Sequence, residues 1–210
     1  MTRENDLLSQ FQMIKATFRD HQKTVPFPAQ VMYVWAIVSA VLIFFTPYIL
    51  EGFTNDFMVT GLFYSIVFIL GITVEYFFIK RANEHAGINI SPTQNYILKT
   101  HMLGGIFGIL MTLVFVQYAI VELLYIFWIF WTGLSVFITG FLTKEFIQKT
   151  GLYMMSIGLM GFAIIIYLKA SHFAPVSRES FFDITMMLSF LAISLTHAWM
   201  GLKLKKEAHV

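Results

Sequence analysis

The stretch FMVTGLFYSIVFILGITVEYFFI, residues 57–79, decides the fold of this protein. Among its 23 residues only Glu75 carries a formal charge. A helix needs about 20 consecutive apolar residues to cross the ~30 Å hydrocarbon core of a bilayer. Backbone polar groups in lipid must be satisfied within the segment, and membrane strands would alternate in character over about 10 residues. The stretch therefore predicts a transmembrane helix.

Five further stretches have the same apolar character. They contain no formal charge and one histidine, His197. Because the loops between them are short, consecutive helices are expected to pack side by side. The predicted fold class is an all-α polytopic membrane protein, whose six transmembrane helices are packed as three antiparallel hairpins. The five stretches are residues 31–50, 102–118, 123–142, 152–168 and 184–202.

The composition agrees with this class and excludes others. The chain is 58% hydrophobic and 12% charged, whereas soluble domains are about 45–50% apolar and about 25% charged. A net charge of +2 and 17% aromatic residues also argue against a disordered or nucleic-acid-binding protein. The expected surroundings are a lipid bilayer, with no nucleic acid partner.

The basic residues predict the orientation. With six spans both termini lie on one side, and that side holds 12 of the 14 Lys and Arg residues. The positive-inside rule then makes both termini cytoplasmic in a multi-pass protein of the cell (inner) membrane. The chain divides into a cytoplasmic N-terminal segment (1–30), a six-helix transmembrane bundle (31–202) and a cytoplasmic basic tail (203–210). The 12 residues are Arg3, Lys15, Arg19, Lys23, Lys80, Arg81, Lys99, Lys144, Lys149, Lys203, Lys205 and Lys206.

The N-terminal segment shows helical periodicity. Leu7, Phe11, Ile14 and Phe18 recur at helical spacing, opposite basic side chains. This pattern predicts a short N-terminal amphipathic helix. Such a helix lies on the inner leaflet, packs under the bundle, or docks a protein partner, and the sequence leaves these possibilities open.

Three ionisable side chains predict a polar cluster in the cytoplasmic half of the bundle. Ionisable residues are costly inside a membrane, so each is a functional-site hypothesis. Glu75 lies four residues before the inner end of its span, and His197 lies six residues before Lys203. His101 immediately precedes the third span at a similar depth. If their helices meet, the three side chains form one substrate or proton site; otherwise each has a separate structural role.

The sequence contains few of the residue patterns that are typical of cofactor sites or of catalytic sites. A haem held by His101 and His197 is a weaker alternative, since axial histidines can come from facing helices. The chain has no Cys and no His-x-x-x-His or Glu-x-x-His pair within a span, so no metal site is expected. Ser135 lacks the second glycine of a nucleophile elbow. The prediction is a non-catalytic protein without a cofactor.

Small residues predict where helices approach closely in lipid. Gly104 and Gly108 form a GxxxG pair on the third span, and Gly158 and Gly161 lie on the fifth. These glycines are expected to serve helix packing. The packing is either within one chain or between copies in a homo-oligomer.

These features favour a small transporter-like or channel-like helix bundle that carries a small solute or ion. The alternative is a membrane sensor or accessory subunit, which binds a membrane protein partner through the N-terminal helix and the inner loops.

Overall fold

The computed structural model describes residues 27–52, 57–118, 120, 123–170 and 178–207. Within these residues six long helices are apolar enough to cross a membrane, which confirms the predicted all-α polytopic class. The predicted N-terminal amphipathic helix lies outside the described residues. The helices are α2 (Ala29–Gly52), α3 (Phe57–His85), α4 (Pro92–Gln117), α5 (Leu124–Leu142), α6 (Glu145–Ala170) and a sixth formed by α7 (Arg178–Ser189), η2 (Phe190–Leu195) and α8 (Thr196–Glu207).

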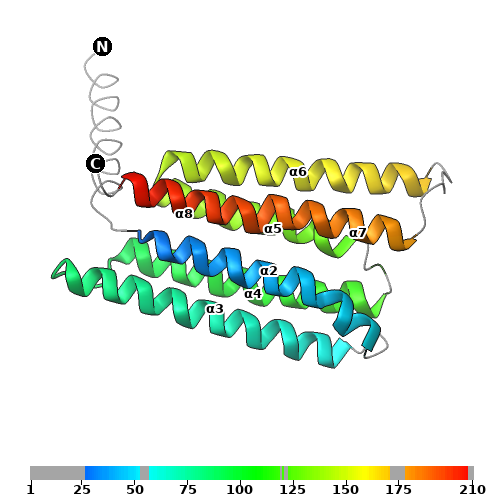
Figure 1. Cartoon of the computed structure of the whole chain (residues 1–210), viewed down its shortest axis with the longest axis horizontal. Helices are drawn as coiled ribbons and strands as arrows, with labels where there is room; N and C mark the ends of the chain where they lie inside the picture. The colour runs from blue at the N-terminus through cyan, green and yellow to red at the C-terminus, as the bar shows by residue number, and fades with distance from the viewer. Residues whose placement is uncertain (1–26, 53–56, 119, 121–122, 171–177, 208–210) are drawn as a thin grey trace, which may run out of the picture.

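All six helices run along the long axis of the molecule (Figure 1). Helix α2 packs against both α3 and α8, so it joins two parts of the bundle (Figure 1). Helix α4 contacts α3 and α5, and the most extensive contact is between α5 and α6. That last pair belongs to different hairpins of the predicted arrangement, and packing as three hairpins stays a prediction.

Helices α3 and α4 both extend beyond the apolar spans that the sequence predicted, so the connection between them is short. Helix α4 begins at Pro92, ten residues before the predicted span, because Ser91 and Gln94 form a capping box. The Ser91 Oγ accepts from the Gln94 backbone N–H (3.1 Å), and the Gln94 Oε1 accepts from the Ser91 N–H (2.9 Å). The buried amides of Gln94 and Asn83 also exchange two hydrogen bonds, of 2.7 and 3.0 Å. The helices therefore continue beyond the apolar core with their polar groups satisfied.

Helices α5 and α6 meet backbone to backbone through glycines. A Cβ added at Gly140 would lie 1.9 Å from the backbone nitrogen of Gln148, and one at Gly151 would lie 2.2 Å from that of Phe137. No side chain fits in such a space, and contacts of this kind are how small residues let helices associate in lipid. The α5–α6 pair is therefore the most closely packed pair of helices among the described residues.

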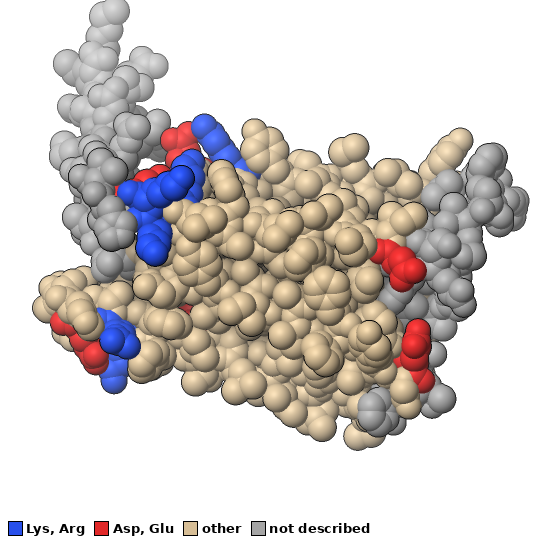
Figure 2. Space-filling model, in the orientation of Figure 1, with Lys and Arg blue, Asp and Glu red and all other residues tan. Residues whose placement is uncertain are grey.

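The outer surface has the character expected for contact with lipid. Leu62, Leu103 and Met160 are each more than 60% exposed. Figure 2 shows the charged side chains gathered at the two ends of the bundle, with residues of other types covering the part between them. On the face drawn there, Lys and Arg occupy one end, where α3 ends, while the opposite end carries acidic side chains (Figures 1 and 2). These six apolar helices make the chain a multi-pass integral membrane protein.

Candidate functional site

Glu75 is a fully buried carboxylate on α3 with two side-chain partners from other helices. Its side chain is 0% exposed. The indole Nε1–H of Trp35, on α2, donates to Oε2 at 2.9 Å. His101 Nδ1, on α4, lies 2.9 Å from Oε1 and 3.0 Å from Oε2. A buried charge is tolerated only when it is paired and hydrogen-bonded, and Glu75 has both kinds of support.

His101 links Glu75 to a third helix. While Nδ1 faces the carboxylate, Nε2 lies 3.0 Å from the Oγ1 of Thr139, on α5. The ring is also packed edge-on against Trp35, with 5.6 Å between ring centroids. Trp35, Glu75, His101 and Thr139 thus form a hydrogen-bonded chain across four helices. We call these four residues the carboxylate chain.

The helix ends explain why Glu75 and His101 meet. Glu75 lies ten residues before the end of α3 at His85, and His101 lies nine residues after the start of α4 at Pro92. At 1.5 Å per residue, Glu75 lies about 15 Å from the end of α3 and His101 lies about 14 Å from the start of α4. The two residues therefore lie at nearly the same level of two neighbouring helices. The basic side chain of Lys80, on the same helix, lies 3.8 Å from the exposed Glu84.

Two cavities adjoin the carboxylate chain. The first, which we call the His101 cavity, has a volume of about 60 Å³ and is lined by His101, Thr139, Ser135 and His197, among others. The second, which we call the tyrosine cavity, has a volume of about 50 Å³ and is lined by Tyr64, Tyr125 and His197, among others. A buried water needs about 10–15 Å³ of such space, so each cavity can hold a few molecules of that size. Both are far below the roughly 300–1,000 Å³ of drug-sized ligand pockets.

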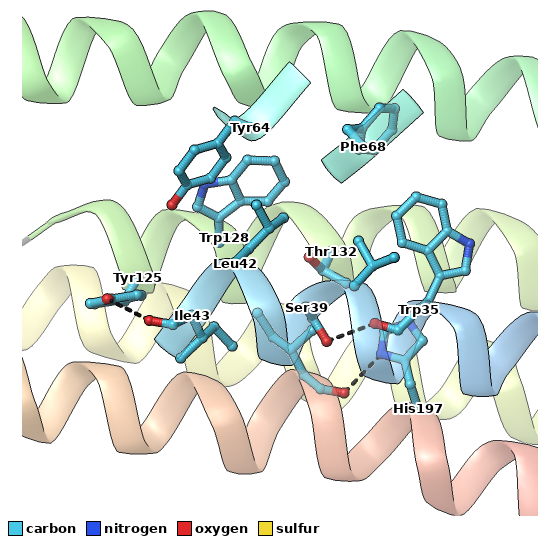
Figure 3. A pocket seen from close by; sticks show the side chains of 12 residues that line it. Trp35, Ser39, Leu42, Ile43, Tyr64, Phe68, Tyr125, Trp128, Thr132 and His197 are labelled. Atoms are coloured by element: carbon cyan, nitrogen blue, oxygen red, sulfur yellow. Dashed lines mark hydrogen bonds between the residues drawn. The ribbon is translucent and has the colours of Figure 1, made fainter. Parts of the chain in front are cut away.

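His197 stands in the wall shared by the two cavities. It is 4% exposed, and its Nδ1 donates to the backbone carbonyl of Ile193 at 2.8 Å (Figure 3). Among the described residues its Nε2 has no hydrogen-bond partner. His101 and His197 therefore border one cavity, whereas Glu75 lies behind His101 and does not line it.

The backbone before His197 departs from α-helical geometry. Residues Phe190–Leu195 form a π-helical turn, and Thr196 Oγ1 accordingly donates to the carbonyl of Leu191, five residues earlier. Within this turn Ser194 lies 2.9 Å from Ser39 of α2, oxygen to oxygen. Short π-helical turns inside α-helices are frequent at functional sites.

The four predicted packing glycines lie against side chains or backbone of α5. A Cβ at Gly108 would lie 2.5 Å from the Trp128 ring, and one at Gly158 would lie 2.7 Å from the backbone nitrogen of Phe130. At Gly161 the nearest atom is a side-chain carbon of Ile126, at 2.9 Å. Gly104 is more open, with the Ser135 Oγ at 3.3 Å from its added Cβ.

The donor set does not fit a haem or a metal ion in this arrangement. Both ring nitrogens of His101 are already hydrogen-bonded, and a cavity of about 60 Å³ separates it from His197. In the described part of the chain no three His, Cys, Asp or Glu side chains lie close enough to hold a metal.

Comparisons with known proteins give no family for this chain. No protein-family model, no curated protein and no solved structure matches it.

Two members of the carboxylate chain were not predicted as site residues. Trp35 has the position of an interfacial tryptophan, four residues into its span, and Thr139 has the pattern of a small packing residue. Their roles depend on which helices meet, and single-span patterns do not carry that information.

Proposed function

We propose that the protein is a small proton-linked transporter or channel, in which Glu75 and His101 hold and pass the proton. The observation that carries the proposal is the fully buried Glu75, which is hydrogen-bonded to His101 beside an internal cavity. Ionisable groups at such depth in a membrane protein mark proton relays and ion pathways.

The pair suits proton exchange because it contains one acid and one base in contact. A proton placed on either group leaves the pair neutral overall, so the bundle can accommodate both arrangements in a low dielectric. Thr139 extends the chain of hydrogen bonds, and its partner His101 lines the His101 cavity, where water can enter the relay.

His197 supports a path rather than an isolated pair. It lines both cavities, and its Nε2 has no hydrogen-bond partner among the described residues. A neutral histidine that donates through Nδ1 has a lone pair at Nε2, which accepts a proton or a hydrogen bond. The path would run from the carboxylate chain through the His101 cavity to His197 and the tyrosine cavity.

The bilayer orientation belongs to the same proposal. Lys and Arg gather at the end of the bundle where α3 ends, and the positive-inside rule makes that end cytoplasmic. Glu75 and His101 then lie in the cytoplasmic half of an inner-membrane protein.

The test is proton flux into liposomes that contain the purified protein and a trapped pH-sensitive dye. A potassium-diffusion potential drives the flux. Glu75→Gln keeps the shape of the side chain but removes its charge, and we expect it to abolish protein-dependent acidification. Glu84→Gln is the matched control, because Glu84 is an exposed carboxylate on the same helix.

Gel filtration and circular dichroism check that both variants fold. Equal flux in Glu75→Gln and the unchanged protein would overturn the proposal, as would wild-type flux no greater than that of empty liposomes.

A further inference from the structure

A large part of the wall of the tyrosine cavity consists of aromatic rings and one histidine. Five aromatic rings contribute to it, from α2, α3 and α5, together with His197 of α8 (Figure 3). No Asp, Glu, Lys or Arg lines it. The five aromatic residues are Trp35, Tyr64, Phe68, Tyr125 and Trp128.

The fixed hydrogen-bond donors of this wall are already used. The indole N–H of Trp35 donates to Glu75, and that of Trp128 donates to the Oγ1 of Thr112 at 3.0 Å. The Tyr125 hydroxyl donates to the backbone carbonyl of Ile43 at 3.0 Å. These three polar hydrogens are therefore turned away from a ligand in the cavity.

The hydroxyls of Tyr64 and Ser39 are used in the same way. Thr46 donates its hydroxyl hydrogen to the backbone of α2, so in its 2.7 Å contact with Tyr64 the tyrosine is the donor. Ser39 donates to the carbonyl of Trp35 at 2.7 Å. Tyr64 and Ser39 therefore offer a ligand oxygen lone pairs and no hydrogen. The hydroxyl of Thr132, which also lines the cavity and has no partner among the described residues, can accept a hydrogen bond as well as donate one.

His197 adds a nitrogen lone pair to the same wall. Because its Nδ1–H is held by the Ile193 carbonyl, the neutral ring presents an unprotonated Nε2, which has no partner among the described residues. A buried acceptor without a partner is unfavourable, and a donor that enters the cavity would satisfy it. Acceptors and aromatic rings together favour a cation that carries N–H donors.

Size narrows the class of ligand. A space of about 50 Å³ accommodates a few water-sized groups. Ammonium and methylammonium, with one and two non-hydrogen atoms, fit within it, whereas larger organic cations do not. Metal cations prefer a shell of several oxygen ligands, which aromatic rings and one imidazole nitrogen do not supply. An anion would meet these acceptors and find the rotatable hydroxyl of Thr132 as its one available donor among the described lining residues.

We propose that the tyrosine cavity binds one small cation with N–H donors, of the ammonium or methylammonium class, through His197 Nε2 and the surrounding aromatic rings. The inference rests on the proposed function, because it names a cargo for the same proton-linked bundle. In this arrangement the carboxylate chain carries the proton, while His197 recognises the cargo.

The experiment measures uptake of radiolabelled methylammonium into liposomes that contain the full-length protein, in parallel with proton flux. We expect saturable uptake that ammonium inhibits and that neither potassium nor tetraethylammonium inhibits. His197→Phe keeps an aromatic ring but removes the acceptor. It should lower the apparent affinity for methylammonium at least about tenfold, the usual size of a lost hydrogen bond to a charged group.

His85→Phe is the matched control. His85 also hydrogen-bonds through Nδ1 to a carbonyl four residues earlier, at 2.8 Å, but it is exposed at the end of α3. Its replacement should leave methylammonium uptake unchanged. Phe68→Leu provides a second test within the cavity, because it removes one ring without removing an acceptor, and it should also weaken uptake.

The outcomes separate the two proposals. Proton flux that depends on Glu75, with no methylammonium uptake and no inhibition by ammonium, would overturn the cargo and leave the proton relay standing. Uptake that is identical in His197→Phe and His85→Phe would overturn the role of His197. Absence of proton flux in every preparation would overturn the proposed function itself.

Discussion

The stability that the hydrogen bond from Trp35 to Glu75 contributes depends on whether the Glu75 carboxyl group is charged. Replacing Trp35 by Phe removes the indole N–H from a bond of 2.9 Å to the carboxylate. Hydrogen bonds to charged groups contribute about 1.5–3 kcal/mol, whereas neutral interhelical bonds in membranes average about 0.6 kcal/mol. If Glu75 is charged, Trp35→Phe therefore lowers the free energy of unfolding by more than the loss of a neutral hydrogen bond would.

The structure supplies a matched neutral bond for comparison. Trp128, which is also partly buried, donates through the same indole nitrogen to the Thr112 hydroxyl at 3.0 Å. Trp128→Phe removes the same atoms, so the two variants lose similar packing. We expect Trp35→Phe to lower the free energy of unfolding by about 1–2 kcal/mol more than Trp128→Phe does, a factor of about 5–30 in the unfolding equilibrium constant.

The assay is reversible unfolding of the purified protein in mixed detergent micelles, followed by far-ultraviolet circular dichroism. A double-mutant cycle completes it: in a Glu75→Gln background the extra loss for Trp35→Phe should disappear, because the acceptor is then neutral. Equal losses for Trp35→Phe and Trp128→Phe in the unsubstituted protein would refute a charged Glu75. So would an extra loss that persists in the Glu75→Gln background.

Two further predictions concern the bundle itself. Gly151→Ala places a Cβ 2.2 Å from the backbone of α5 and should cost about 1–3 kcal/mol of stability in the same unfolding assay. Gly52→Ala is the control and should cost almost nothing, because no atom lies within 4 Å of its added Cβ. Similar losses for both variants would contradict backbone contact between α5 and α6. Since the chain has no Cys, Arg81→Cys and Asp183→Cys each create a unique thiol. In intact cells a membrane-impermeant thiol reagent should label Asp183→Cys and leave Arg81→Cys unlabelled, and the reverse pattern would invert the proposed orientation.

Much of the fold follows from patterns that the sequence carries locally. Runs of about 20 apolar residues predict helices because lipid offers the backbone no partner. Helix ends are less evident, since the polar first turns of α4 belong to the helix only through the cap at Ser91. The π-helical turn at Phe190–Leu195 was not predicted, because its six residues are an ordinary apolar stretch that contains neither Gly nor Pro. The turn packs against α2, where Ser194 lies 2.9 Å from Ser39, and that contact is not visible in the span alone.

The sequence predicted the ionisable residues of the candidate site but not the contacts between them. Glu75 and His197 stand out because ionisable side chains are rare in apolar spans, and His101 was placed at the same depth. That His101 contacts Glu75 follows from the packing of α3 against α4, and the link to Thr139 follows from the packing of α4 against α5. Which helices are neighbours is a property of the whole bundle, so no single span reveals it.

The most direct test of the proton relay is the infrared spectrum of the reconstituted protein as the pH is changed. A carboxyl group absorbs differently with and without its proton, and subtraction of the Glu75→Gln spectrum isolates the signal from Glu75. The relay predicts a carboxyl band that appears and disappears with pH, is absent from Glu75→Gln and is altered in His101→Asn. Spectra of the unsubstituted protein and Glu75→Gln that change identically with pH would show that Glu75 exchanges no proton, which contradicts the relay.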